Sequence, residues 1–177
     1  MLEMLKISPF GAFHTAVSLV AVVAGLIALI CYKAISLKNR TGQTYVLATV
    51  ITCLTGFGIF HHGGFGAPHV LGVITLAVLG IAALAGSTPL FGRASPYVET
   101  LSYSMTFFFH MIPTVTEIST RFPIGAPLVT DRDGPALHAA TGVLFIAFLI
   151  GAAVQARWLH ALRRSPEAAA SGAVHAI

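Results

Sequence analysis

The chain has 177 residues, of which 56% are hydrophobic and 9% charged, and its mean hydropathy is +0.85. Such a chain cannot cover itself with a polar surface, so the composition excludes a soluble globular protein and predicts an integral membrane protein. Its net charge of +4 gives no reason to invoke nucleic acid, since basic residues flanking membrane helices account for it.

Five stretches are long and apolar enough to be membrane helices, which need about 20 residues to cross the hydrocarbon core. They are, in chain order, about Phe10 to Leu37, Gln43 to Phe60, His69 to Ala85, Val98 to Thr120 and Leu137 to Leu159. We predict an all-α fold: one transmembrane helical bundle over residues 1–165, followed by a mobile cytoplasmic tail over residues 166–177. A count of four spans is the alternative, because the fourth stretch is the most polar.

The first stretch opens with Ser8 and Pro9, residue types that favour a helix cap and a first helical position. It is too long for the apolar core of a signal peptide, so we expect it to stay in the protein. His14 lies near its beginning.

The second and third stretches meet at a hinge rich in glycine, residues 63–68. His61 and His62 precede the hinge and His69 follows it. Because neighbouring residues on a helix point about 100° apart, at most one of His61 and His62 faces the bundle.

The fourth stretch carries polar residues at steps of three or four, a spacing that places them on one helical face. They are Glu99, Tyr103, Thr106, His110, Thr114 and Glu117. We expect His110 near mid-membrane and Glu117 about 10 Å further along the axis.

Before the fifth stretch, the segment from Arg121 to Gly134 contains many turn formers. It is long enough to form a lid over the bundle end, and a solvated turn is the alternative. Pro135 then places His138 in the first turn of the last helix.

Orientation follows from the basic residues near the helix ends. With the N-terminus outside, Lys6, Arg121 and Arg132 lie outside. The remaining seven are cytoplasmic: Lys33, Lys38, Arg40, Arg93, Arg157, Arg163 and Arg164. This bias predicts an outside N-terminus, and we expect a multi-pass protein of the bacterial inner (cytoplasmic) membrane.

In that topology the helix ends bring several histidines to one layer near the outer face. Ionisable residues in membrane helices are costly, so they indicate a functional site. We expect a transition metal (zinc, copper or iron) or a b-type haem there, two choices that the sequence leaves open. The candidate metal ligands are His14, His62, His69, His138 and Glu117. In either version His14, His69 and His138 are the candidate cofactor-binding residues, and His110 and Glu117 are the candidate catalytic or proton-handling residues.

No phosphate-binding loop, dinucleotide fingerprint or nucleophile elbow occurs in the sequence. The segments 38–45 and 68–72 resemble the corresponding regions of small uncharacterised bacterial multi-pass membrane proteins, over about half of the chain. That family more often has His-Arg where this chain has Lys38 to Arg40. The resemblance implies a compact helical membrane fold and no particular activity.

We therefore expect a histidine-rich membrane protein, an oxidoreductase if it is an enzyme, that supports electron transfer or oxidation of a small or lipid-soluble molecule such as a quinone. One alternative is a non-enzymatic anchor in a larger membrane complex or homo-oligomer. Another is reversible metal binding for uptake or sensing.

Overall fold

The computed structural model describes residues 8–59 and 64–164. Those residues form five α-helices, one short 3₁₀ helix and no strand: α1 (Pro9–Tyr32), α2 (Arg40–Gly56), α3 (Ala67–Ser87), η1 (Gly92–Ala94), α4 (Ser95–Arg121) and α5 (Pro135–Arg164). The predicted all-α class is confirmed, and each helix falls on one predicted stretch. The histidines His61 and His62 and the predicted tail, residues 166–177, lie outside the described residues.

Local sequence signals set the helix ends. Ser8 caps α1 as predicted, because its side chain accepts a hydrogen bond from the backbone N–H of Gly11 at 3.0 Å. Asn39 caps α2 in the same way through Gly42. The first helix ends at Tyr32 rather than Leu37, because Lys33 adopts a left-handed conformation with φ of 62°.

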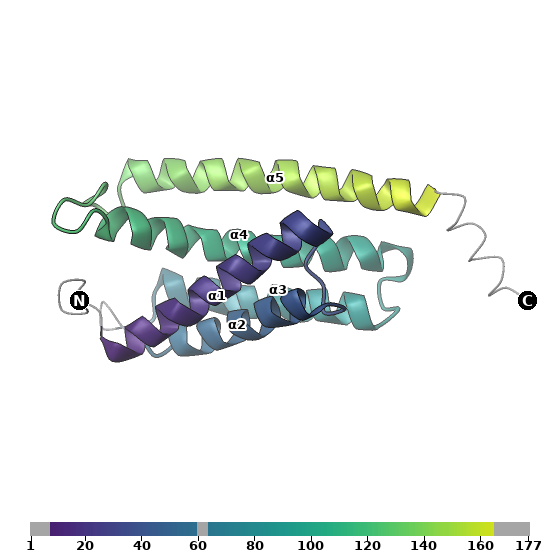
Figure 1. Ribbon diagram of the computed structural model, residues 1–177, viewed down its shortest axis with the longest axis horizontal. Helices are drawn as coiled ribbons and strands as arrows, with labels where there is room; N and C mark the ends of the chain where they lie inside the picture. Colours follow the sequence, from purple (N-terminus) through teal and green to yellow (C-terminus); the bar gives the residue numbers. More distant parts are fainter. Residues whose placement is uncertain (1–7, 60–63, 165–177) are drawn as a thin grey trace, which may run out of the picture.

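Four of the helices form a ring (Figure 1). Helix α1 packs against α2, α2 against α3, α3 against α4, and α4 against α1. Across the ring, α2 and α4 meet through side chains: Tyr45 and Thr106 join their hydroxyls at 2.8 Å. Helix α5 lies outside the ring and packs against α4.

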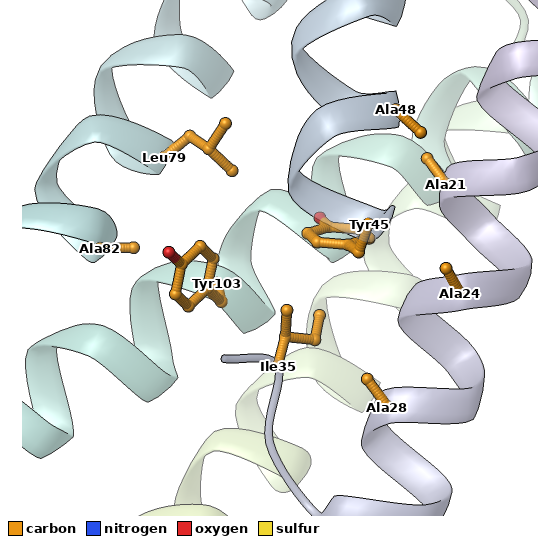
Figure 2. Close-up of a cluster of buried hydrophobic side chains, with 9 residues drawn as sticks. All are labelled: Ala21, Ala24, Ala28, Ile35, Tyr45, Ala48, Leu79, Ala82 and Tyr103. Carbon is orange, nitrogen blue, oxygen red and sulfur yellow. The ribbon is translucent and has the colours of Figure 1, made fainter. Parts of the chain in front are cut away.

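The core of the ring combines small apolar residues with two large tyrosines (Figure 2). Ala21, Ala24 and Ala28 line one face of α1 and let α2 approach closely. Tyr45 of α2 and Tyr103 of α4 are fully buried in the space between the helices. The polar stripe predicted on α4 therefore faces protein at its centre, where Thr106 and His110 are also buried.

Three helices, α1, α3 and α5, are long and apolar enough to cross a membrane. Large apolar side chains are exposed along all three, for example Ile30, Val73 and Ile150. This surface is typical of a membrane protein, in which lipid covers what the protein leaves open.

The alternation of helix direction gives the bundle two different ends. One end, called here the histidine end, contains the start of α1, the end of α2, the start of α3, the end of α4 and the start of α5 (Figure 1). The opposite end, called the basic end, carries seven basic residues in or next to helix ends: Lys33, Lys38, Arg40, Arg93, Arg157, Arg163 and Arg164. Among the described residues, the histidine end has only Arg121 and Arg132.

Candidate functional site at the histidine end

His14 lies in the second turn of α1, half-buried against the end of α2. Its Nδ1 is 2.9 Å from the hydroxyl of Thr55. That hydroxyl already donates its proton to the backbone carbonyl of Ile51 at 2.8 Å, so it accepts from the His14 Nδ1–H. With the hydroxyl proton on the Ile51 carbonyl, the neutral ring carries its proton on Nδ1 and Nε2 is the basic nitrogen; a hydroxyl that donated to Nδ1 instead would reverse the tautomer.

His110 also forms a hydrogen bond with a threonine hydroxyl of α2, at a position deeper in the bundle than His14. Its Nε2 is 3.1 Å from the hydroxyl of Thr49, which donates to the backbone carbonyl of Tyr45 at 2.7 Å. With the Thr49 proton on the Tyr45 carbonyl, the ring donates from Nε2 and Nδ1 is its basic nitrogen. Thr49 and Thr55 are six residues apart on α2, about 9 Å along the helix axis, so the two imidazoles occupy successive levels of the bundle.

The two levels interact. His14 and His110 are close enough for an electrostatic interaction between their rings. Below His110, Tyr45 connects to Thr106, and its ring meets the His110 ring edge-on with centroids 6.0 Å apart. A polar column, formed by His14, Thr55, Thr49, His110, Tyr45 and Thr106, therefore extends from the histidine end into the centre of the ring.

Glu117 lies near His14 and interacts with it electrostatically. Its carboxylate also forms ion pairs with Arg121, one turn further along α4, and with Arg132 at 3.0 Å. Glu117 is therefore an anchored carboxylate within range of His14. To ligate a metal ion it would have to exchange at least one arginine.

His69 and His138 occupy the first turns of their helices at this same end. The Nδ1 of His69 accepts a hydrogen bond from the backbone N–H of Gly66 at 3.1 Å, capping α3. The neutral ring then carries its proton on Nε2, so this cap has to open before His69 can bind a metal ion. His138 differs, because its Nδ1 donates to the backbone carbonyl of Gly134 at 3.0 Å and leaves Nε2 basic.

Four sequence-predicted residues, His14, His69, Glu117 and His138, thus lie at one end of the bundle, and they are not gathered into one cluster. Within residues 8–59 and 64–164, no three side chains of His, Cys, Asp or Glu converge closely enough to hold a metal ion together. His14 and Glu117 are near each other, whereas His69 and His138 cap separate helices. His62, the remaining predicted ligand, lies outside the described residues.

The segment from Arg121 to Gly134, predicted as a lid or a solvated turn, is tied to the end of α4. Arg132 reaches Glu117, and the backbone N–H of Val129 donates to the carbonyl of Ser119 at 3.0 Å. Asp131 accepts from the backbone N–H of Asp133, as in an ordinary solvated turn.

Sequence reasoning missed the two threonines that orient the imidazoles. Thr49, Thr52 and Thr55 follow one another at steps of three, which is a visible signal for one face of a helix. Comparison of the chain with protein-family models, with curated proteins and with solved structures gave no match.

Proposed function

We propose that the protein spans the bacterial inner membrane five times and binds a redox cofactor at its histidine end, facing outward. The cofactor is a b-type haem or a transition metal ion, and the activity is electron transfer or oxidation of a small or lipid-soluble molecule such as a quinol, the reduced form of a quinone. The basic end then faces the cytoplasm, as the positive-inside rule requires.

One observation carries the proposal: the 2.9 Å hydrogen bond that joins Nδ1 of His14 to the Thr55 hydroxyl of α2. Imidazoles that bind metals usually donate their other ring N–H to a protein acceptor, which fixes the tautomer and the ring plane. The bond to Thr55 fixes His14 in that way inside an apolar bundle. His138 has the equivalent bond to a backbone carbonyl.

The chain's residues divide into two roles under this proposal. His14 and His138 have the required tautomer as ligands, and His69 and His62 are the candidates to complete the set. Glu117 and His110 handle protons, since oxidation of a quinol releases protons that a carboxylate and a basic imidazole can accept. The position of His110, about two turns deeper than His14, does not suit a second ligand to the same centre.

The test is an optical spectrum of the protein purified in mild detergent, oxidised and dithionite-reduced, together with elemental analysis of the same sample. A Soret band with sharpened reduced bands supports haem, and stoichiometric iron or copper without that band supports a bare redox metal. Stoichiometric zinc would support a metal site but contradict electron transfer, because zinc has no redox chemistry. His14→Gln should lose at least nine-tenths of the bound cofactor. The matched control is His160→Gln, an exposed histidine at the basic end, which should retain it.

A different function is favoured if neither signal is found. Helix α5 packs on α4 outside the ring and leaves most of its surface exposed, which suits an anchoring subunit of a membrane complex. Co-purification of a stoichiometric partner, unchanged by His14→Gln, would support the anchor and exclude the redox proposal. Metal that exchanges freely with the buffer would instead indicate uptake or sensing.

A further inference from the structure

A groove of about 750 Å³ lies between the first turn of α4 and the last turns of α5, at the basic end. Its lining residues are Tyr97, Ala156, Arg157, His160, Ala161 and Arg164. The two alanines carry short side chains, so they leave room between the longer basic residues. This groove is at the opposite end from the histidine site and takes no part in the proposed redox function.

No ion pair neutralises the basic residues of the groove in the described part of the chain; Glu99, at the same end of the bundle, accepts a hydrogen bond from Ser36. Arg157, His160 and Arg164 are three or four residues apart, so they share one face of α5. Arg163 adds a further charge, with its guanidinium 5.1 Å from the centre of the Tyr97 ring. Both ion pairs found among residues 8–59 and 64–164 involve Glu117, at the other end of the bundle.

The groove lies at the depth of lipid headgroups. Helix α5 has 30 residues and is therefore about 45 Å long, whereas the hydrocarbon core is about 30 Å thick. Its apolar part ends at Val154, and Gln155 begins a polar stretch. Trp158 follows, with the ammonium of Lys33 5.9 Å from its ring centre. Tryptophan beside basic residues is typical of the membrane interface.

We propose that this groove binds the phosphate headgroup of an anionic phospholipid, with Arg157 and Arg164 as the principal contacts. Arginine pairs with phosphate through two parallel hydrogen bonds, and basic pockets between membrane helices on the cytoplasmic side are suited to anionic headgroups. The exposed apolar surface of α5 next to the groove, including Val154, offers a path for an acyl chain.

Trp158 makes the proposal directly measurable, because it is the only tryptophan in the chain. Phosphatidylglycerol with brominated acyl chains is added to the protein in neutral-detergent micelles, and quenching of the Trp158 fluorescence is recorded. Brominated phosphatidylcholine serves as the zwitterionic comparison. We expect half-maximal quenching by phosphatidylglycerol at a mole fraction at least about tenfold lower.

The variants identify the contacts. Arg157→Gln combined with Arg164→Gln should raise the half-maximal mole fraction of phosphatidylglycerol about 30-fold, since each basic residue near a headgroup contributes about a fivefold change. Arg93→Gln removes a charge at the same end but outside the groove, and it should change little. Circular dichroism of each variant checks that it is folded. Each single variant, Arg157→Gln or Arg164→Gln, should raise the half-maximal mole fraction by a smaller factor than the double variant.

Three results would overturn the proposal. The first is equal quenching by the two lipids, and the second is a folded double variant that keeps the lipid preference. In the third, millimolar inorganic phosphate abolishes the preference for phosphatidylglycerol, which would make the groove a site for a free anion. Loss of cofactor at the histidine end has no bearing on these outcomes, so the two proposals stand or fall separately.

Discussion

The two sides of α4 hold their neighbours in different ways. Toward the ring, α4 uses polar contacts: Thr106 bonds Tyr45 at 2.8 Å and His110 bonds Thr49 at 3.1 Å. Toward α5 it uses mainly aromatic packing, with the ring of Phe108 5.7 Å from that of Phe145 and 5.6 Å from that of Phe148, and one hydrogen bond from Ser104.

This difference matters because lipid is as apolar as a leucine side chain. Apolar burial alone therefore gives membrane helices little reason to associate, and close packing and hydrogen bonds decide which helices meet. In the middle of the ring, α2 and α4 are joined by hydrogen bonds, and α1 and α3 contribute closely packed apolar residues such as Ala24 and Ala82. Helix α5 has one buried polar side chain, Gln155, among its described residues. We conclude that the ring is fixed in register, whereas α5 is held by aromatic contact and a single polar anchor.

The largest expected effect comes from glycines that distinguish the two regions. A Cβ at Gly25 of α1 would lie 2.6 Å from the ring of Phe107 and 2.9 Å from the fully buried ring of Tyr45. Gly25→Ala should therefore destabilise the protein by about 1–3 kcal/mol through overpacking. A Cβ at Gly151 of α5 meets nothing within 4 Å, so Gly151→Ala should be neutral or stabilise by up to about 1 kcal/mol.

Both glycine variants can be measured by unfolding in mixed micelles with increasing sodium dodecyl sulfate, followed by helical circular dichroism. Equal effects of the two substitutions would mean that the ring is no more tightly packed than the contact with α5. The proposed difference between the packing of the ring and the packing of α5 would then be wrong.

The second prediction concerns the anchor of α5. Gln155 accepts a hydrogen bond from the Ser104 hydroxyl and donates one to the backbone carbonyl of Lys33, both at 2.8 Å. Gln155→Leu removes both bonds, and we expect a loss of about 1–2 kcal/mol in the same unfolding assay. Gln155→Glu keeps an acceptor for Ser104 but cannot, when ionised, donate to the Lys33 carbonyl. A glutamate variant as stable as the wild type would show that the bond to Lys33 contributes nothing.

Much of the fold was predictable because the strongest signals are local. Apolar length gave the five helices, and Ser8 with Pro9 gave the start of the first. The spacing of Tyr103, Thr106 and His110 correctly predicted one buried face on α4. Such features depend on helix geometry alone, so a single sequence contains them.

The partners across helices were not predictable in the same way. Thr49 and Thr55 each donate to a carbonyl of their own helix, so their hydroxyls are satisfied in any orientation of α2, and nothing local indicates an imidazole opposite. The pairing of Glu117 with Arg132 depends on how the connecting segment folds back. Sequence therefore predicted the level of the candidate site but not the groups that orient it.

The smallest effect is the most direct measure of polar coupling inside the ring. Tyr45→Phe and Thr106→Val each remove one side of the hydrogen bond between α2 and α4. Combined in a double-mutant cycle, they should show a coupling of about 0.6 kcal/mol, the average for such bonds in a membrane protein. The comparison is the pair Phe108→Leu and Phe148→Leu, which reports the aromatic contact with α5. A coupling free energy between Tyr45 and Thr106 indistinguishable from zero would mean that close packing alone sets the register of the ring. The two hydroxyls would then be bonded no more favourably in the folded protein than in the unfolded chain in detergent.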